Sequence, residues 1–325
     1  MELSLVDAVN HGLRDAMTAD ETVLVLGEDV GVDGGVFRAT NGLLDTFGDS
    51  RVLDTPLAEA GIAGLSVGLA AQGFRPVAEI QFSGFMYTCL DQLICHASRL
   101  RNRTRGRLHC PMVLRAPYGG GIGAPELHSE SMEALFAHVP GLRVVIPSSP
   151  ARAYGLLRAA IQDPDPVVFL EPKRIYRAVN EEVDVDAGSL PLDRCFVLRE
   201  GEHVTLVSWG AMIRECLAAA EELSAQGVSC ELVDVATLNP FDADTVLASV
   251  EKTGRAVIVE EAPYHGGFGA QVASMLAERG LFSLRAPVKR VAGFDTIMPL
   301  PRLEKHYMPD SSRVVQAVLP LMEYD

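Results

Sequence analysis

The segment T-V-L-V-L-G-E-D, from Thr22 to Asp29, contains the pattern that decides the fold. Its run of valine and leucine predicts a short strand, and Gly27 followed by two acidic residues predicts where that strand ends. A short strand without polar alternation is typical of a parallel sheet that helices cover on both faces. We therefore expect this segment to lie in the interior of an α/β domain.

Short apolar runs of the same kind recur along the first half of the chain and alternate with helical patterns. The predicted strands are Pro76–Ile80, Met112–Arg115, Leu142–Ile146 and Val167–Leu170. The predicted helices are Leu5–Met17, Ala58–Ala71, Met86–Leu100, Ser131–Ala137 and Arg152–Ile161. Ala58–Ala71 is small and apolar along its whole length and is expected to be buried. Strands that alternate with helices predict a mostly parallel sheet.

The chain changes character in the segment Arg177–Leu198, which carries several acids and little periodicity. A second, shorter α/β series follows it. Its predicted strands are Val204–Ser208, Ser229–Asp234, Ala256–Glu260 and Val288–Ala292, and its predicted helices are Ile213–Gln226, Asp242–Val250, Gly269–Glu278 and Arg313–Met322. A length of 325 residues also suggests two domains. We expect one domain at residues 1–180, a linker at 181–200 and a second domain at 201–325.

The charge of the chain limits its partners. The formal net charge is −15, with no long run of one sign. This argues against nucleic acid and against an anionic membrane surface as main partners. The one basic cluster is either a solvated helix end or a patch at a protein interface; it comprises Arg99, Arg101, Arg103, Arg105 and Arg107.

The N-terminus and the cysteines predict a location. No basic region precedes an apolar stretch at the start of the sequence. No window has the roughly 18 uninterrupted apolar residues that a membrane span needs. The six cysteines form no C-x-x-C pair and several lie in apolar runs, so we expect buried thiols. Together these features predict a cytoplasmic protein.

Residues that follow the strands are candidate site residues, because parallel sheets place ligands beyond the carboxyl ends of their strands. Glu28 and Asp29 either hold a buried polar contact or lie in an exposed turn. Glu59 opens an apolar helix, where it is either favoured by the helix dipole or is a partly buried functional acid. Phe82 and Phe85 are either core residues or a flat face for a heteroaromatic ring.

The segment Tyr118–Ser129 is rich in glycine and also follows a predicted strand. A phosphate cradle is one interpretation, but the loop lacks G-K-[ST], and Pro147-Ser148 rather than an acid follows the next strand. The composition favours a mobile loop that carries His128 into a pocket. A second glycine-rich segment, Gly266–Gln271, is an imperfect G-x-G-x-x-G, because Val272 stands in place of the last glycine.

Taken in order, these segments resemble the beta subunits of the decarboxylating component of 2-oxo acid dehydrogenase complexes. The motifs that carry the likeness are G-E-D-V-G…G-G-V-F-R-A-T, D-T-P-L-A-E-A-G-I-A-G, E-I-Q-F-S-G-F and G-G-G-I-G…H-S-E-S-M-E-A. V-T-L-V-S-W-G-A-M at Val204–Met212 and E-A-P-Y-H-G-G-F-G-A at Glu261–Ala270 continue it. The resemblance implies an α/β, transketolase-like fold: a parallel-sheet domain that binds the pyrimidine of thiamine diphosphate, followed by a transketolase C-terminal-type domain.

The resemblance also implies roles for single residues. Glu59 matches the glutamate that hydrogen-bonds the pyrimidine nitrogen and so promotes removal of the thiazolium proton. His128 matches the histidine beside the reacting carbon, a proton donor or acceptor. Phe85 matches the aromatic residue that packs on the pyrimidine. The other cofactor-binding positions are Glu28, Leu57 and Gln81.

A structural potassium site, built mainly from carbonyl oxygens, is a further implication of the resemblance. It maps to Cys110, Met112, Val113, Ala160, Asp163 and Asp165. The segment Asp163–Pro166 is equally typical of a plain turn.

The substrate is expected to be a branched-chain 2-oxo acid, because G-G-V-F-R-A-T resembles that type of subunit. The acyl group would pass to a lipoyl group of the dihydrolipoyl acyltransferase component. Leu127 and Met132 depart from the pattern beside the substrate pocket, so a pyruvate or acetoin dehydrogenase beta subunit is the alternative. A two-domain nicotinamide-dependent oxidoreductase is a further alternative, but both glycine-rich segments are imperfect matches to the dinucleotide-binding motif. A noncatalytic scaffold is disfavoured because it would not need both Glu59 and His128.

One motif of thiamine enzymes is absent. In the family, a G-D-G segment followed by an asparagine holds Mg²⁺ and the diphosphate, and no G-D-G occurs in this sequence. We therefore expect an alpha subunit to hold Mg²⁺ and the diphosphate, in an alpha2beta2 heterotetramer, and this chain alone to be inactive.

Overall fold

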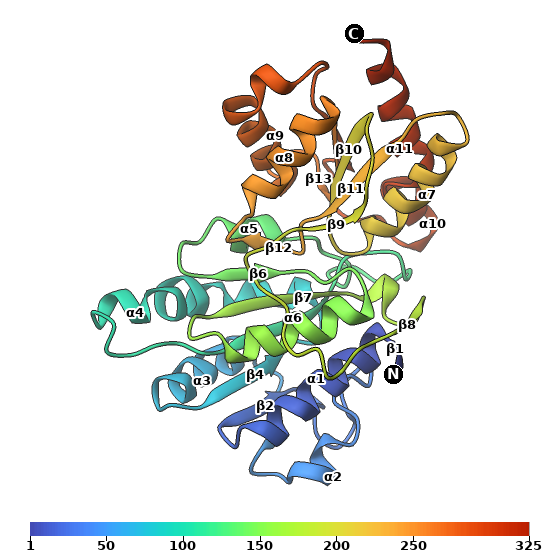
Figure 1. The fold of residues 1–325 in the computed structure, drawn as a ribbon. Coiled ribbons are helices and arrows are strands. Elements are labelled where there is room, and N and C mark those ends of the chain that lie inside the picture. The colour runs from blue at the N-terminus through green and yellow to red at the C-terminus, as the bar shows by residue number, and fades with distance from the viewer. Residues whose placement is uncertain (325) are drawn as a thin grey trace. The chain divides into compact units, whose positions relative to one another are not determined.

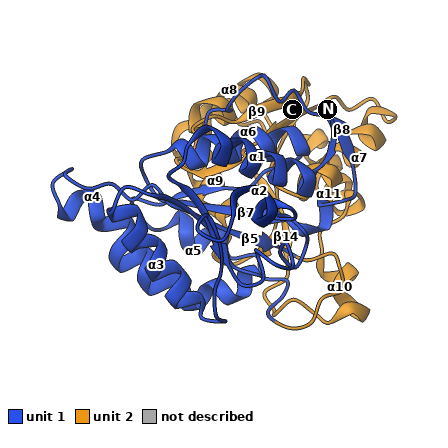
Figure 2. Ribbon diagram, turned by 90° about the horizontal axis from the view of Figure 1, so that it is seen from below, with its two compact units in different colours: residues 1–119, 127–192 blue, residues 120–126, 193–325 orange. Residues whose placement is uncertain are grey.

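The chain forms two compact units, which Figure 2 distinguishes by colour. The structure is a computed structural model and describes residues 1–324. Unit 1 comprises residues 1–119 and 127–192, and unit 2 comprises residues 120–126 and the chain from Asp193 onward. The short loop 120–126 therefore belongs to unit 2, although the residues on either side of it in the chain belong to unit 1.

The centre of unit 1 is a parallel sheet with the strand order β6-β7-β5-β4-β2-β3. Its strands are β2 (Val23–Gly27), β3 (Val52–Asp54), β4 (Arg75–Glu79), β5 (Val113–Tyr118), β6 (Arg143–Val145) and β7 (Val167–Pro172). Every residue of β2, β5 and β7 is buried, which confirms interior strands. Two short strands near the ends of unit 1, β1 (Glu2–Ser4) and β8 (Asn180–Glu182), pair antiparallel.

The longer helices of unit 1 begin at residues that suit a helix start. α1 (Leu5–Ala19) packs along α6 (Pro150–Gln162), as Figure 1 shows. The Asp7 N–H donates to Ser4 Oγ at 3.3 Å and the Arg152 N–H to Ser149 Oγ at 3.4 Å, so each helix has a serine N-cap. Other helical elements of unit 1 are α2 (Leu43–Phe47), α3 (Glu59–Ala71), α4 (Leu100–Arg103), α5 (Glu133–Ala137) and the 3₁₀ turn η4 (Lys173–Ile175).

The helix predicted to be buried at Ala58–Ala71 forms as α3, but half of it faces outward. Its buried residues are Ile62, Ala63, Ser66 and Ala70, whereas Leu65 is 49% exposed. The prediction of burial is therefore wrong for one face. Apolar residues occur all around this helix, so its composition does not show which side packs on the sheet.

The single helix predicted at Met86–Leu100 is broken into shorter pieces. They are the 3₁₀ helix η1 (Ser83–Cys89), the π-helix η2 (Gln92–His96) and the 3₁₀ helix η3 (Ala97–Arg99), followed by α4. The backbone is crowded here, because a Cβ at Gly141 would clash with the Ser98 carbonyl. Side-chain periodicity does not separate an α-helix from a chain of tighter and wider turns.

Unit 2 is built on a sheet with the order β14-β13-β10-β11-β9. β10 (Val204–Ser208), β11 (Cys230–Asp234), β13 (Ala256–Pro263) and β14 (Lys289–Gly293) are parallel, and β9 (Phe196–Arg199) is antiparallel to β11. The other elements of unit 2 are α7 (Met212–Ser224), β12 (Thr237–Asn239), α8 (Ala243–Thr253), α9 (Phe268–Arg279), η5 (Leu281–Ser283), α10 (Pro301–Tyr307), α11 (Ser311–Val318) and η6 (Leu319–Glu323).

The cysteines are free thiols, and all are buried except Cys95. The expectation of burial is wrong for Cys95 because it lies on η2, where Leu93 is the buried residue. Burial raises the pKa of Cys89 and of Cys110 to about 12, so these thiols stay protonated at neutral pH. Within residues 1–324, no helix has the length and apolar character needed to cross a membrane.

Candidate active site

The predicted site residues of unit 1 follow neighbouring parallel strands. β5, β4, β2 and β3 lie side by side, so their carboxyl ends share one edge of the sheet. Glu28 follows β2, Glu59 begins α3 after β3, and Gln81 follows β4. In an open parallel sheet this edge is where ligands bind.

Glu28 has a buried carboxylate with unused hydrogen-bonding capacity. The side chain is 6% exposed, and it accepts a hydrogen bond from the Ala58 backbone N–H. Burial raises the pKa of the Glu28 carboxyl, and the nearby charges of Glu59 and Asp29 raise it further. Among the described residues, its Oε1 has no hydrogen-bond partner although it is buried. Such an atom is suited to a ligand that brings an N–H group.

Glu59 occupies the first position of α3 and is half-buried. Its side chain lies near that of Glu28, since its charge acts on the Glu28 carboxyl. The Cys89 Sγ donates to the Glu59 backbone carbonyl at 3.3 Å, which ties the start of the helix to η1. The helix dipole favours an acidic side chain at this position.

Three rings form an aromatic wall in unit 1. The His128 imidazole lies 4.3 Å from the Phe82 ring and 5.1 Å from the Phe85 ring, measured between centroids. The Phe82 and Phe85 rings are 6.0 Å apart and edge to face. Neither phenylalanine is fully buried, so neither is an ordinary core residue. The wall therefore presents aromatic surface that is open to a ligand.

The backbone around His128 is fixed by contacts with η1. The Ser83 Oγ donates to the Glu130 carbonyl at 2.8 Å, and the Gly119 N–H donates to the same carbonyl at 3.2 Å. A Cβ at Gly84 would clash with the Leu127 carbonyl, so the two backbones approach as closely as glycine permits. Leu127 itself has a φ of 65°, in the left-handed region. His128 is thus presented from a closely held backbone.

Leu57 and Gln81 lie at the edge of this region. Leu57 is 79% exposed. The Gln81 Nε2 donates to Asp29 Oδ2 at 2.9 Å, so Gln81 links the segments that follow β4 and β2. Leu57 stands two residues before Glu59 in the chain, and its exposed side chain leaves it open to a ligand contact.

The glycine-rich loop 120–126 is bound to two carboxylates of unit 2. The Gly121 and Gly123 N–H groups donate to Glu304 Oε1 and Oε2 at 2.7 and 2.8 Å, and the Gly120 N–H donates to Glu261. These amides already have anionic acceptors, so the structure gives no support to a phosphate cradle. The expected mobile loop is instead anchored at three amides. The sequence did not indicate Glu261 or Glu304, because no local pattern connects them to the loop.

A charged network is buried beneath the sheet edge of unit 1, and sequence reasoning missed it as well. The Arg115 Nε and Nη2 donate to Glu171 Oε1 and Oε2 at 2.7 and 2.8 Å, and its Nη1 pairs with Glu79. The Tyr176 hydroxyl donates to Glu171 Oε2 at 2.6 Å. Burial raises the pKa of Glu79, although the Arg115 charge opposes that shift. Glu79 and Arg115 lie in predicted strands and Glu171 follows one, but the sequence did not indicate that they pair.

The six positions of the predicted potassium site lie in unit 1, and several of their oxygens already accept hydrogen bonds. The Asp163 carboxylate pairs with Arg143 at 2.9 Å and the Asp165 carboxylate with Arg101 at 2.9 Å. The Met112 carbonyl accepts from the Val167 N–H at 2.9 Å. A cavity of about 340 Å³ adjoins Cys110 and Asp165. Potassium binding at Cys110, Met112, Val113, Ala160, Asp163 and Asp165 stays a prediction.

Comparisons with known proteins agree with this two-unit arrangement. Residues 1–179 match the model of the transketolase pyrimidine-binding domain, and residues 193–314 match that of the transketolase C-terminal domain. A pyruvate dehydrogenase E1 component subunit beta from Staphylococcus epidermidis is 49% identical over 323 residues, covering 99% of each chain. The chain belongs to the family of 2-oxo acid dehydrogenase E1 beta subunits.

Other relatives of this E1 beta subunit give the same result. The Bacillus subtilis protein of the same name is 47% identical over 323 residues and covers 99% of each chain. A solved structure titled "Split gene transketolase, inactive beta4 tetramer" has a TM-score of 0.82 at 24% identity, and the alignment covers 100% of this chain and 99% of that one. This structural likeness confirms the transketolase-like fold.

The relatives do not support the expected substrate type. The E1 beta subunits compared with this chain are named as pyruvate dehydrogenase components, so the branched-chain prediction has no support from them. That prediction rested on the G-G-V-F-R-A-T segment alone. The alternative of a pyruvate dehydrogenase beta subunit agrees better with these names.

Proposed function

We propose that this chain is the beta subunit of a pyruvate dehydrogenase E1 component, that it uses thiamine diphosphate, and that it works with an alpha subunit. The observation that carries the proposal is the group of Glu28, Glu59 and the ring wall at the carboxyl edge of a pyrimidine-binding-type domain. The names of relatives at 45–49% identity support the assignment to pyruvate.

The residues of unit 1 fit the aminopyrimidine half of thiamine diphosphate. Within residues 1–324 the buried Oε1 of Glu28 lacks a hydrogen-bond partner. A pyrimidine brings ring nitrogens and an amino group that can form hydrogen bonds with the carboxyl groups of this site. Phe85, which is partly exposed, offers a flat surface for a heteroaromatic ring. When bound, the cofactor supplies the carbon nucleophile that adds to the 2-oxo group and accepts the electrons left by CO₂.

Each side chain then has a defined task. Glu59 hydrogen-bonds a ring nitrogen of the pyrimidine and shares a proton with it. The charge of Glu59 raises the pKa of the neighbouring Glu28 carboxyl, so the two acids act on one another in this site. Phe85 orients the ring, together with the contacts at Leu57 and Gln81. His128 holds or moves a proton at the substrate oxygen.

The second half of the cofactor site is proposed to come from the alpha subunit. The sequence has no G-D-G segment. Within residues 1–324 no group of three or more His, Cys, Asp or Glu side chains could hold a metal ion. Mg²⁺ and the diphosphate are therefore assigned to the alpha subunit of an alpha2beta2 heterotetramer. The acyl product would pass to a lipoyl group of the dihydrolipoyl acyltransferase.

The test is to co-express this chain with its alpha subunit and to compare pyruvate, 2-oxoisovalerate, 2-oxoisocaproate and acetoin as substrates. We expect kcat/KM to be highest for pyruvate, by about tenfold or more, which corresponds to about 1.4 kcal/mol of transition-state binding. Each subunit purified alone serves as the control and should not decarboxylate. A higher kcat/KM for the branched-chain acids would contradict the assignment to pyruvate and favour the substrate type that the G-G-V-F-R-A-T segment indicates. Turnover by the beta chain alone would contradict a cofactor site shared with the alpha subunit.

A further inference from the structure

The loop 120–126 ends two residues before His128 and is bound by a carboxylate from a distant part of the chain. Both oxygens of Glu304 are engaged: Oε1 accepts from the Gly121 N–H at 2.7 Å and Oε2 from the Gly123 N–H at 2.8 Å. Glu304 lies on α10 and is 8% exposed. Hydrogen bonds between an anionic acceptor and backbone amides are stronger than neutral ones.

The loop has left-handed glycines and packs closely on other residues of unit 2. Gly121 has a φ of 95° and Gly123 a φ of 67°, in the region that favours glycine. A Cβ at Gly120 would lie 2.7 Å from Met298 Cε and 3.3 Å from Glu304 Oε1, so the loop packs closely on its surroundings in unit 2. Glu304 therefore supplies anionic acceptors to amides of exposed glycines, which would otherwise bond only to solvent.

We propose that Glu304 is a positioning residue, which holds the loop 120–126 in one conformation and thereby fixes the backbone that leads into His128. The inference rests on the proposed role of His128 in proton transfer. Catalytic groups must be held close to their productive geometry, because small displacements reduce rates strongly. Glu304 does not have to touch substrate or cofactor for this effect.

Substitutions at Glu304 separate its charge from its shape. Glu304→Gln keeps the size of the side chain but turns one acceptor oxygen into an NH₂ group, which faces an amide N–H and cannot accept from it. Glu304→Asp keeps both anionic oxygens on a shorter stem. We expect Glu304→Gln to release one of the two loop amides and Glu304→Asp to restore part of the binding.

The first measurement is hydrogen exchange at Gly121 and Gly123, in the full chain assembled with its alpha subunit. Exchange of these amides should accelerate about 10–100-fold in Glu304→Gln, since a hydrogen bond to a charged group protects to that extent. Unchanged exchange would overturn the proposal.

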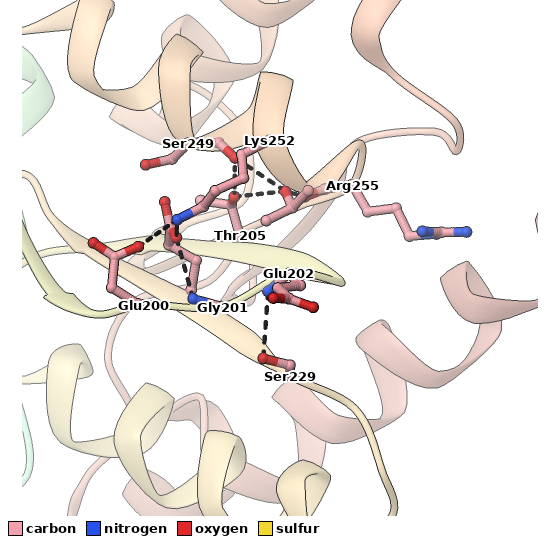
Figure 3. A network of polar contacts seen from close by, with 10 residues as sticks. Glu200, Gly201, Glu202, Thr205, Ser229, Ser249, Lys252 and Arg255 are labelled. Atoms are coloured by element: carbon pink, nitrogen blue, oxygen red, sulfur yellow. Dashed lines mark hydrogen bonds and ion pairs between the residues drawn. The ribbon is translucent and has the colours of Figure 1, made fainter.

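A matched control is available in unit 2. Glu231 is also a buried carboxylate that accepts from a glycine amide, with the Gly201 N–H at 3.2 Å, and it pairs with Lys252. Figure 3 shows the network of Glu200, Gly201 and Lys252 to which it belongs. Glu231→Gln should disturb that network but leave exchange in the loop and turnover as in the wild type. If Glu231→Gln also accelerates exchange in the loop, the effect of Glu304→Gln is general loosening and the proposal is overturned.

The second measurement asks whether Glu304 acts through His128. Glu304→Gln should lower kcat for pyruvate decarboxylation about tenfold or more, while KM for pyruvate and Kd for thiamine diphosphate change less than twofold. In a His128→Ala background the same substitution should have almost no further effect, because residues that act through one another are not additive.

The outcomes distinguish this inference from the proposed function. Fully additive losses, in an enzyme where His128→Ala is itself damaging, overturn the positioning role of Glu304 and leave the proposed function standing. Wild-type turnover in His128→Ala overturns the role of His128 and the positioning role together. Faster loop exchange in Glu304→Gln with wild-type kcat also overturns the positioning role.

Discussion

The imidazole ring of His128 packs on the phenyl ring of Phe82, with 4.3 Å between the ring centroids and 56° between the ring planes. The two residues follow different strands, β4 and β5, whose parallel pairing brings their carboxyl ends together. Phe85 adds a second ring at 5.1 Å. This packing limits the orientations that the imidazole can adopt, which is a requirement for directed proton transfer.

We expect His128→Ala to lower turnover by about 10²–10⁴-fold, the usual contribution of a positioned acid or base. Binding of thiamine diphosphate should change much less. The measurement is steady-state decarboxylation of pyruvate by the assembled enzyme, with cofactor affinity determined separately. His138→Ala is the control, because His138 is an exposed residue that follows α5. Equal activity of the two variants would show that His128 is dispensable.

Glu59→Gln tests the acid at the start of α3. Glutamine keeps the size of the side chain but does not share a proton with a pyrimidine nitrogen in the same way. We expect loss of about 4 kcal/mol of barrier lowering, which is about a thousandfold in rate, with folding retained. The measurement is exchange of the thiazolium C2 proton for deuterium. If Glu59 only complements the helix dipole, the change would cost about 0.3–1 kcal/mol of stability and leave exchange at the wild-type rate.

The sequence predicted most of the fold because the relevant signals are local. β2, β4, β5 and β7 were predicted from short, mainly apolar runs. Glu28 and His128 were found in segments that follow such runs, and Glu59 was found because it opens an apolar helix. Glu304 could not be found in this way, because 183 residues separate it from Gly121 and only the fold joins them.

Two further misses have the same physical origin. Arg115 is the last residue of the predicted strand Met112–Arg115, and nothing in that pattern indicated that Glu79 and Glu171 on neighbouring strands balance its charge. The outward face of α3 was missed because residues such as Leu65 are as apolar as those that pack inward. Pairing between strands and the choice of a packed face depend on tertiary contacts, which a local pattern does not contain.

Gly84→Ala should displace the backbone that presents His128. The new Cβ would clash with the Leu127 carbonyl, and overpacking of this kind costs about 1–3 kcal/mol. We expect a lower Tm and a lower kcat together. Gly68→Ala is the control: it lies in the interior of α3 with nothing near its Cβ, and should be neutral or stabilising by about 0.5–1 kcal/mol. A Gly84→Ala enzyme with wild-type kcat would show that the close approach is not needed for His128.

Glu28 gives a prediction for pH dependence. Its pKa in the folded chain is raised above the ordinary value of 4.5, chiefly by burial. The folded chain therefore keeps a proton that the unfolded chain releases, so stability is full below about pH 4.5 and falls as pH rises through the folded pKa. Glu28→Gln removes this loss, and its Tm advantage over wild type should grow with pH. Thermal unfolding of the cofactor-free chain from about pH 4 to 8 measures it, with the exposed Glu222→Gln as control. A pH-independent difference would contradict the raised pKa.

Arg115→Met tests the buried network of unit 1. Arg115 and Glu171 are 1% and 0% exposed, so removal of the guanidinium leaves Glu79 and Glu171 as unpaired buried acids. Breaking such a pair costs about 3–5 kcal/mol, whereas the exposed pair of Arg279 and Asp244 should cost at most about 1 kcal/mol in Arg279→Met.

Loss of the Arg115 charge also raises the pKa of Glu79 further, because that charge is the main influence lowering it. The folded Arg115→Met variant then holds more protons than wild type at neutral pH. Its loss in free energy of unfolding relative to wild type should therefore become smaller as the pH falls. Chemical unfolding at two pH values measures both effects, and an equal, small loss in the two arginine variants would mean that the network contributes no more than a surface pair.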